Sequence, residues 1–149
     1  MKNLTIGEAV DLYNVMVSFT ELANKENLNL PGNVSYALFR NVKKLDSVFT
    51  FFTDKQKELI EANAQRDKKG EIKYEDKEKG VIKLKKDNTL NKDFADYVSL
   101  ESGVDLYTVK IDVEELAKTV NGSHTTLNML WFVLENINAE SNVKVLESV

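Results

Sequence analysis

The sequence predicts an α+β fold dominated by helices, with a long antiparallel helix pair, a small antiparallel β-hairpin or sheet, and further helices at the C-terminal end. Two observations lead to this prediction. Over 6–25 the polar residues, and over 35–68 the apolar residues, recur mostly at intervals of three and four, the spacing of one face of an α-helix. Over 71–75 and 81–85, apolar and charged residues alternate instead, which is typical of strands. The length of 149 residues fits one domain, 1–149.

The first helix is predicted over 6–25. Thr5 and Glu8 stand three residues apart at its start, where the side chain of each can accept a hydrogen bond from the backbone N–H of the other. Its polar residues form one narrow stripe and the rest of its surface is apolar, so we expect neighbours on two sides. Pro31 and Gly32 then mark a turn.

The second helix is predicted over 35–68, antiparallel to the first. Its apolar residues follow a heptad spacing, which keeps one stripe against a neighbouring helix. This seam consists of Leu38, Val42, Leu45, Phe49, Phe52 and Leu59. A capping-box pattern at 53–56 would split the helix at Thr53, but the seam keeps its phase there. We therefore expect one continuous helix to about Lys68, stopped by Gly70.

A projecting β-hairpin is predicted over 71–86. Its two alternating segments place the apolar residues on one face and the charged residues on the other. The apolar face carries Ile72, Tyr74, Ile82 and Leu84. Because two strands alone are marginal in water, this face needs a cover. A helix, a partner, or a third strand from segment 105–111, where the alternation recurs, would supply it.

Three shorter helices are expected over 91–101, 112–120 and 123–138. Asp112 and Glu115 form an N-cap pair at the start of the second of these. The remaining tail, 139–149, is too apolar for a free end, so we expect it to dock on the body or on another chain. The predicted core includes Leu12, Phe19, Leu45, Phe49 and Trp131.

Composition narrows the class of protein. Apolar residues make up 42% and charged residues 30%, which supports an ordinary hydrophobic core. The apolar runs are too short for a membrane span, and the first ten residues lack the pattern of a secretory signal, so we expect an intracellular protein. The net charge is −4, with three basic against eight acidic residues over 101–149, whereas 66–92 holds ten basic against six acidic residues.

No sequence pattern with a known catalytic mechanism is present, so we expect no enzyme, no metal and no cofactor. The chain has no cysteine and one histidine, His124, whose place beside Ser123 at a helix start suits a surface capping role. Phosphate-binding glycine loops and a nucleophile elbow are both missing. Carboxylate pairs such as Glu114 and Glu115 are adjacent, so on a helix they point in different directions.

Surface patterns point instead to binding. Apolar side chains on the hairpin and in the tail would exceed what a monomer usually exposes. The partner-binding candidates are Ile72, Tyr74, Ile82, Leu84, Val143, Val145 and Leu146. Basic residues around the hairpin form a weaker, phosphate-facing candidate set, because interleaved carboxylates neutralise most of their field. These nucleic-acid candidates are Arg66, Lys68, Lys69, Lys73, Lys83, Lys85 and Lys86.

Several short stretches stand at the boundaries of the predicted elements. They are Arg66-Asp67-Lys68-Lys69-Gly70-Glu71-Ile72, Asp93-Phe94-Ala95-Asp96-Tyr97, Val104-Asp105-Leu106, Ile111-Asp112-Val113-Glu114-Glu115-Leu116 and Leu127-Asn128-Met129-Leu130. In these stretches and in the order of its elements, the chain resembles a family of small proteins of unassigned function encoded by tailed bacteriophages. The resemblance implies a phage setting and supplies no catalytic residues.

The resulting functional hypothesis is a non-enzymatic interaction protein, virion-associated or accessory. We expect it to bind a viral or host protein, or a second copy of itself, in the host cytoplasm or in the virion. Two alternatives stay open. A small acidic domain could inhibit a host defence protein such as a nuclease by occluding its basic groove. The protein could instead be a nucleic-acid accessory that binds weakly through the basic hairpin, although nucleic acid is not the expected main partner.

Overall fold

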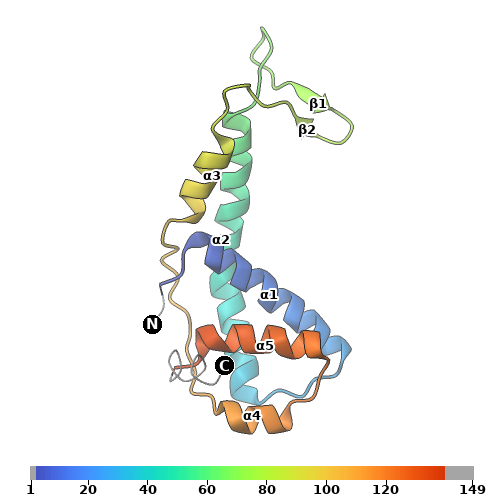
Figure 1. The fold of residues 1–149 in the computed structure, drawn as a ribbon, viewed down its shortest axis with the longest axis vertical. Coiled ribbons are helices and arrows are strands. Elements are labelled where there is room, and N and C mark those ends of the chain that lie inside the picture. Colours follow the sequence, from blue (N-terminus) through green and yellow to red (C-terminus); the bar gives the residue numbers. More distant parts are fainter. Residues whose placement is uncertain (1–2, 140–149) are drawn as a thin grey trace.

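The computed structural model describes residues 3–139 of the chain, and helices make up 59% of them. The helices are α1 (Ile6–Lys25), α2 (Gly32–Ala62), α3 (Leu90–Val98), α4 (Val113–Thr119) and α5 (His124–Ile137). Strands β1 (Tyr74–Asp76) and β2 (Val81–Ile82) form a two-stranded antiparallel sheet beyond the C-terminal end of α2 (Figure 1). The helix-dominated α+β class with a long helix pair is confirmed.

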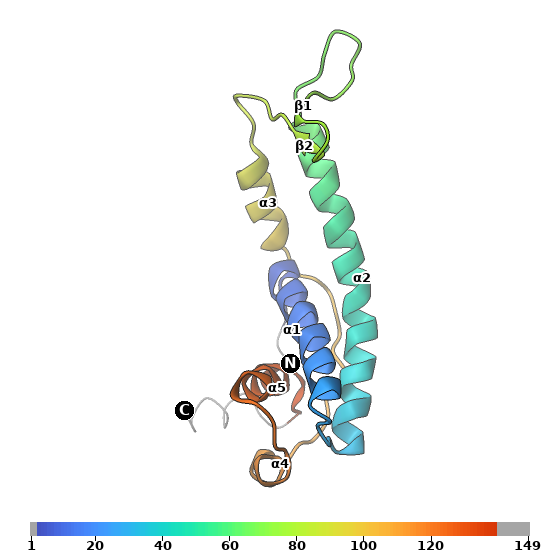
Figure 2. The same ribbon diagram turned by 90° about the vertical axis from the view of Figure 1, so that its right-hand side faces the viewer.

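Helix α1 is central, as its apolar circumference predicted. It has the predicted bounds because Thr5 and Glu8 form the expected capping box, each side chain accepting the other's backbone N–H at 3.1 Å. On one side it packs against α2, to which it is antiparallel, and on the other side it packs against α5 (Figure 2). Leu12, Phe19 and Leu45 are fully buried between these helices.

Helix α2 is continuous through Thr53, as the phase of its seam predicted. The hydroxyl of Thr53 donates back to the carbonyl oxygen of Phe49 at 3.0 Å, so Thr53 does not cap a new helix. The predicted C-terminal bound was wrong, because α2 ends at Ala62 and not near Lys68. Gly70 instead lies in a separate turn, with φ +81°.

The early end of α2 has a physical cause in Asn63. Its side-chain amide donates to the carbonyl oxygen of Leu59 at 2.9 Å, and its side-chain oxygen accepts the backbone N–H of Thr89 at 2.9 Å. Its own carbonyl oxygen accepts the backbone N–H of Lys85 at 2.9 Å. These bonds to distant residues replace those that a longer helix would make.

After the turn at Asn63, residues 64–66 pair with both arms of the hairpin, Ala64 with Leu84 and Arg66 with Ile72. The backbones of Gln65, Lys73 and Lys83 form a closed ring of hydrogen bonds: Lys73 donates to Gln65, Lys83 to Lys73 and Gln65 to Lys83, at 2.8–2.9 Å. The strands themselves are shorter than the predicted 71–75 and 81–85, because this three-way pairing leaves room for only a brief two-stranded ladder.

Segment 105–111 is not the third strand of this sheet, and that expectation was wrong. It runs along the other half of α2, far from the hairpin (Figure 1). The buried side chain of Asn41 accepts the backbone N–H of Tyr107 at 2.7 Å and donates to its carbonyl oxygen at 2.8 Å. At the end of α5, Val109 donates to Ile137 and accepts from Ala139. The alternating sequence thus marks an extended segment held by helices.

The remaining helices have bounds close to those expected. Asp112 caps α4 by accepting the backbone N–H of Glu115 at 3.1 Å, and Ser123 caps α5 by accepting that of Thr126 at 3.2 Å. Phe49 and Trp131 are half-buried, so they lie at the margin of the core and not in its centre. Phe49 stacks on the ring of Tyr13, with 4.7 Å between ring centroids.

Candidate functional site

The hairpin residues predicted to bind a partner are partly buried. Ile72, Ile82 and Leu84 are half-buried, and Tyr74 is exposed by 43%. The structure therefore leaves a smaller apolar surface here than the sequence suggested. The tail candidates Val143, Val145 and Leu146 lie outside the described residues.

The basic residues predicted to face phosphates are all exposed at the far end of α2. These residues are Arg66, Lys68, Lys69, Lys73, Lys83, Lys85 and Lys86. The guanidinium of Arg66 donates to the carbonyl oxygen of Gly70 at 2.9 Å, which stabilises the turn. The carboxylate of Asp67 lies within that turn and accepts the backbone N–H groups of Lys69 and Glu71. The carboxylate of Asp67, which lies among these cations, is therefore held in place by the turn.

A more exposed aromatic surface lies on the outer face of α2, where sequence reasoning did not place a site. Phe39 and Arg40 follow Tyr36 by three and four residues, and Lys43 follows Arg40 and Phe39 by three and four, so the four side chains share one broad face of the helix. Tyr36 is 52% exposed and Phe39 is 59% exposed. Together with Tyr107, which packs beside them, these residues are called the aromatic–basic face.

Cations cover the rings of the aromatic–basic face. The guanidinium carbon of Arg40 lies 4.5 Å from the ring centroid of Tyr107 and 5.7 Å from that of Tyr36. The two tyrosine rings meet edge to face, with centroids 5.7 Å apart. The ammonium nitrogen of Lys43 lies 4.7 Å from the ring centroid of Phe39. Such cation–π contacts hold long side chains in a defined arrangement on the surface.

Two residues of α2 hold the segment that carries Tyr107 against this helix. Asn41, on the buried side of α2, makes the pair of hydrogen bonds to the Tyr107 backbone described above. One turn further along, the ammonium group of Lys44 donates to the carbonyl oxygen of Asp105 at 2.6 Å. The position of Tyr107 therefore depends on α2 and not on a sheet.

The charge of this part of α2 is uniformly positive. From Gly32 to Leu45 the only charged residues are Arg40, Lys43 and Lys44, although the whole chain has a net charge of −4. Among residues 3–139, neither Arg40 nor Lys43 forms an ion pair with a carboxylate. Their charges thus remain available to an anionic group from outside.

An apolar groove adjoins Phe39 between α1 and α2, with a volume of about 320 Å³. Its lining residues are Phe19, Thr20, Ala23, Asn24, Leu28, Leu30, Ser35, Leu38, Phe39 and Val42. The ring of Phe39 therefore belongs both to the groove and to the aromatic–basic face. This shared residue makes the two features one continuous surface.

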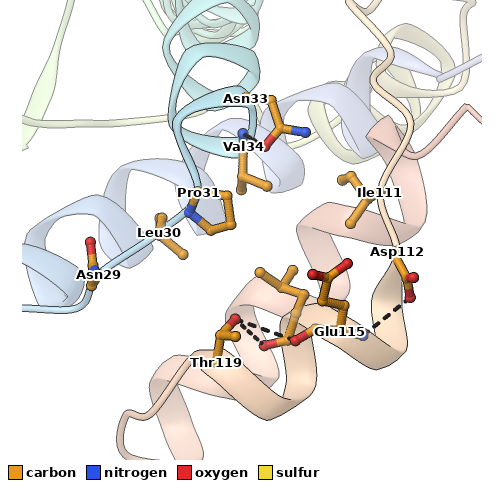
Figure 3. A pocket seen from close by; sticks show the side chains of 10 residues that line it. Asn29, Leu30, Pro31, Asn33, Val34, Ile111, Asp112, Glu115 and Thr119 are labelled. Carbon is orange, nitrogen blue, oxygen red and sulfur yellow. Dashed lines mark hydrogen bonds between the residues drawn. The ribbon is translucent and has the colours of Figure 1, made fainter.

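A second pocket, of about 510 Å³, lies between the turn before α2 and helix α4 (Figure 3). Asp112 and Thr119 on its wall use their side-chain oxygens for hydrogen bonds within α4. Within residues 3–139, no group of three histidine or carboxylate side chains could hold a metal ion. The pocket thus offers a polar rim over an apolar floor, without a cluster of reactive groups.

Glu26 and Tyr13, both within the described residues, have shifted pKa values, and both serve the fold. Hydrogen bonds from the Thr126 hydroxyl and the Ser123 backbone lower the pKa of Glu26, which ties the end of α1 to the start of α5. A hydrogen bond to Asp46 raises the pKa of Tyr13. His124 is the first residue of α5 and is exposed, while the capping oxygen belongs to Ser123.

The sequence does contain a signal for the aromatic–basic face. Tyr36 and Phe39 do not fit the seam that starts at Leu38 and continues through Val42 and Leu45. Large aromatic residues outside the seam of a packed helix point to solvent or to a partner. The contribution of Tyr107 has no local signal, because it depends on a contact across 66 residues of sequence.

Comparisons of the chain with protein-family models, with curated proteins and with solved structures find no match. None of the helices within residues 3–139 is both long enough and apolar enough to cross a membrane.

Proposed function

We propose that this chain is a non-enzymatic protein that acts by binding another protein, and that the aromatic–basic face is its principal contact. One observation carries the proposal: Tyr36 and Phe39 expose more than half of their surface beside Arg40 on a rigid helix. Tyrosine and arginine are enriched among the residues that dominate binding energy at interfaces, and aromatic residues are enriched at interfaces generally. Because these residues stand on a helix, their backbone loses little conformational freedom on binding.

The setting that we propose is a tailed bacteriophage. The resemblance of the boundary motifs supports a phage-encoded protein, whose partner is a viral protein in the virion or a host protein in the cytoplasm. Mass spectrometry of purified particles distinguishes the two locations. The chain is found in the particles in the first case and only in the infected cell in the second.

A second copy of the chain is one partner to consider. Tyr74 and Val81 on the hairpin and Phe39 on α2 provide exposed apolar side chains for such a contact. Light scattering across a dilution series shows a mass that falls on dilution if copies associate. A constant monomer mass at all concentrations would exclude self-association and leave a different protein as the partner.

Quantitative affinity capture from the cells that produce the protein tests the proposal. Phe39→Ser removes an exposed ring of the face, whereas Phe132→Ser removes an exposed ring from α5 and serves as the matched control. We expect specific polypeptides to be retained by the wild type and by Phe132→Ser and to be lost with Phe39→Ser. Polypeptides retained equally by all three proteins would contradict the proposed contact.

The non-enzymatic part of the proposal has its own test. Esters, phosphoesters and nucleic acids are incubated with the protein, with and without divalent metal ions. We expect no turnover. Reproducible turnover that disappears when one polar residue is replaced would contradict this part of the proposal.

A further inference from the structure

We propose that the aromatic–basic face and the adjoining groove bind an acidic amphipathic segment of the partner protein. In this arrangement carboxylates of the segment pair with Arg40 and Lys43, while an apolar side chain of the same segment enters the groove on the other side of Phe39. The inference rests on the proposed function and adds the chemistry of the partner to it.

The charge of the face selects an anionic partner. Arg40 and Lys43 have no carboxylate partner among the described residues, and the rest of the chain carries the acidic excess. A basic face on an acidic protein attracts an acidic segment, and unlike the basic hairpin over 66–92, α2 has no carboxylate between Gly32 and Leu45. Charge of this pattern sets the orientation and the rate of association more than the final affinity. A basic groove, such as that of a nuclease, would be repelled from this face.

The groove supplies the apolar part of the contact. Its floor contains Phe19, Ala23, Leu38 and Val42, and Phe39 forms its rim toward the cations. A volume of about 320 Å³ accommodates an aromatic or aliphatic anchor side chain. Anchors that fill a pocket at the centre of a contact provide much of its binding energy, and surrounding polar pairs exclude water. An amphipathic segment supplies both.

The same residue types could serve single-stranded nucleic acid, but the geometry favours a protein. Bases bind to such surfaces by stacking on open aromatic faces. Here Arg40 already covers Tyr107 and approaches Tyr36, and Lys43 lies over Phe39. A base would have to displace these cations, whereas a carboxylate can approach them from outside. The net charge of −4 also disfavours a long polyanion.

Peptide selection tests the chemistry directly. A displayed library of random peptides is selected on the full-length wild-type protein, and affinities of the enriched peptides are measured by fluorescence anisotropy. We expect enriched peptides that combine carboxylates with an aromatic or aliphatic residue, and affinities that fall as salt is added. Enriched peptides that are neutral or basic would overturn the inference.

Charge reversal locates the binding site. Arg40→Glu and Lys43→Glu should each weaken acidic peptides at least tenfold, whereas Lys92→Glu on α3 should leave their affinity unchanged. Circular dichroism of each variant verifies that it remains folded. Equal binding by all variants, or binding of a single-stranded oligonucleotide that competes with the peptides, would overturn the inference.

If affinity capture still depends on Phe39 but not on Arg40, the acidic partner is refuted and the proposed function stands. If capture depends on neither, both fail.

Discussion

Replacing Asn41 by alanine should loosen the segment that carries Tyr107. Asn41 is fully buried on the inner side of α2, and its side-chain amide satisfies both backbone groups of Tyr107, at 2.7 and 2.8 Å. Alanine keeps the helix but removes both hydrogen bonds. The N–H and carbonyl groups of Tyr107 are then left without partners at a partly buried position.

The magnitude follows from these two bonds. A buried polar group left unsatisfied costs about 1–3 kcal/mol, and water can reach part of this site. We therefore expect a loss of about 2–4 kcal/mol in the free energy of unfolding. For a chain of this size that corresponds to a fall of about 5–15 °C in the midpoint of thermal unfolding. Native stabilities of about 5–15 kcal/mol leave the variant folded in most of this range.

Urea denaturation of the wild type, Asn41→Ala and Asn14→Ala measures the effect. Asn14 is exposed on α1, so its replacement should change stability by no more than about 0.5 kcal/mol. Hydrogen exchange of the Tyr107 amide should also become faster in Asn41→Ala. If Asn41→Ala is as stable as Asn14→Ala, the buried asparagine does not hold this segment, and the reasoning is refuted.

Three further predictions concern other parts of the structure. Leu45→Ala, at a fully buried position of the seam, should cost about 2–5 kcal/mol in urea denaturation, and a cost below 1 kcal/mol would contradict its burial. Because folding lowers the pKa of Glu26 below 4.5, its stabilising effect is present above that pH and is lost as the pH falls through the lowered pKa. Thermal unfolding of Glu26→Gln should therefore lose less stability on acidification than the wild type, and identical pH profiles would contradict this. Arg40→Glu removes the two cation–π contacts of an exposed side chain and should lower the free energy of unfolding by about 0.5–2 kcal/mol, and a larger loss would contradict the surface position of Arg40.

The elements that the sequence predicted well are those with local causes. Helix α1 has its predicted bounds because Thr5 and Glu8 cap it within one turn. Helix α2 is continuous through Thr53, as predicted from the apolar seam, which keeps the same heptad phase on both sides of that residue. Its end was misplaced because Asn63 bonds to Lys85 and Thr89, and no pattern near residue 63 reports such contacts.

Buried asparagines explain most of what the sequence could not show. Asn41 and Asn138 hold segment 105–111 by its backbone, in place of the sheet that its alternating residues suggested, and Asn63 binds the backbone of Thr89 at the start of α3. A polar residue in a seam predicts that the seam fades, but not which distant backbone it binds. The candidate site follows the same rule. The sequence shows that Tyr36 and Phe39 lie outside the seam. That Tyr107 and the groove adjoin them can be seen only in the folded structure.

Photochemical crosslinking in the producing cells tests the central proposal most directly. A photoreactive amino acid replaces Tyr36 or Phe39 on the aromatic–basic face, Tyr74 on the hairpin, or Phe132 on α5 as the control. We predict that positions 36 and 39 form an adduct with one discrete polypeptide, that position 132 does not, and that Arg40→Glu abolishes the adduct. Adducts that form from position 74 but not from 36 or 39 would contradict the proposal and return the contact to the hairpin.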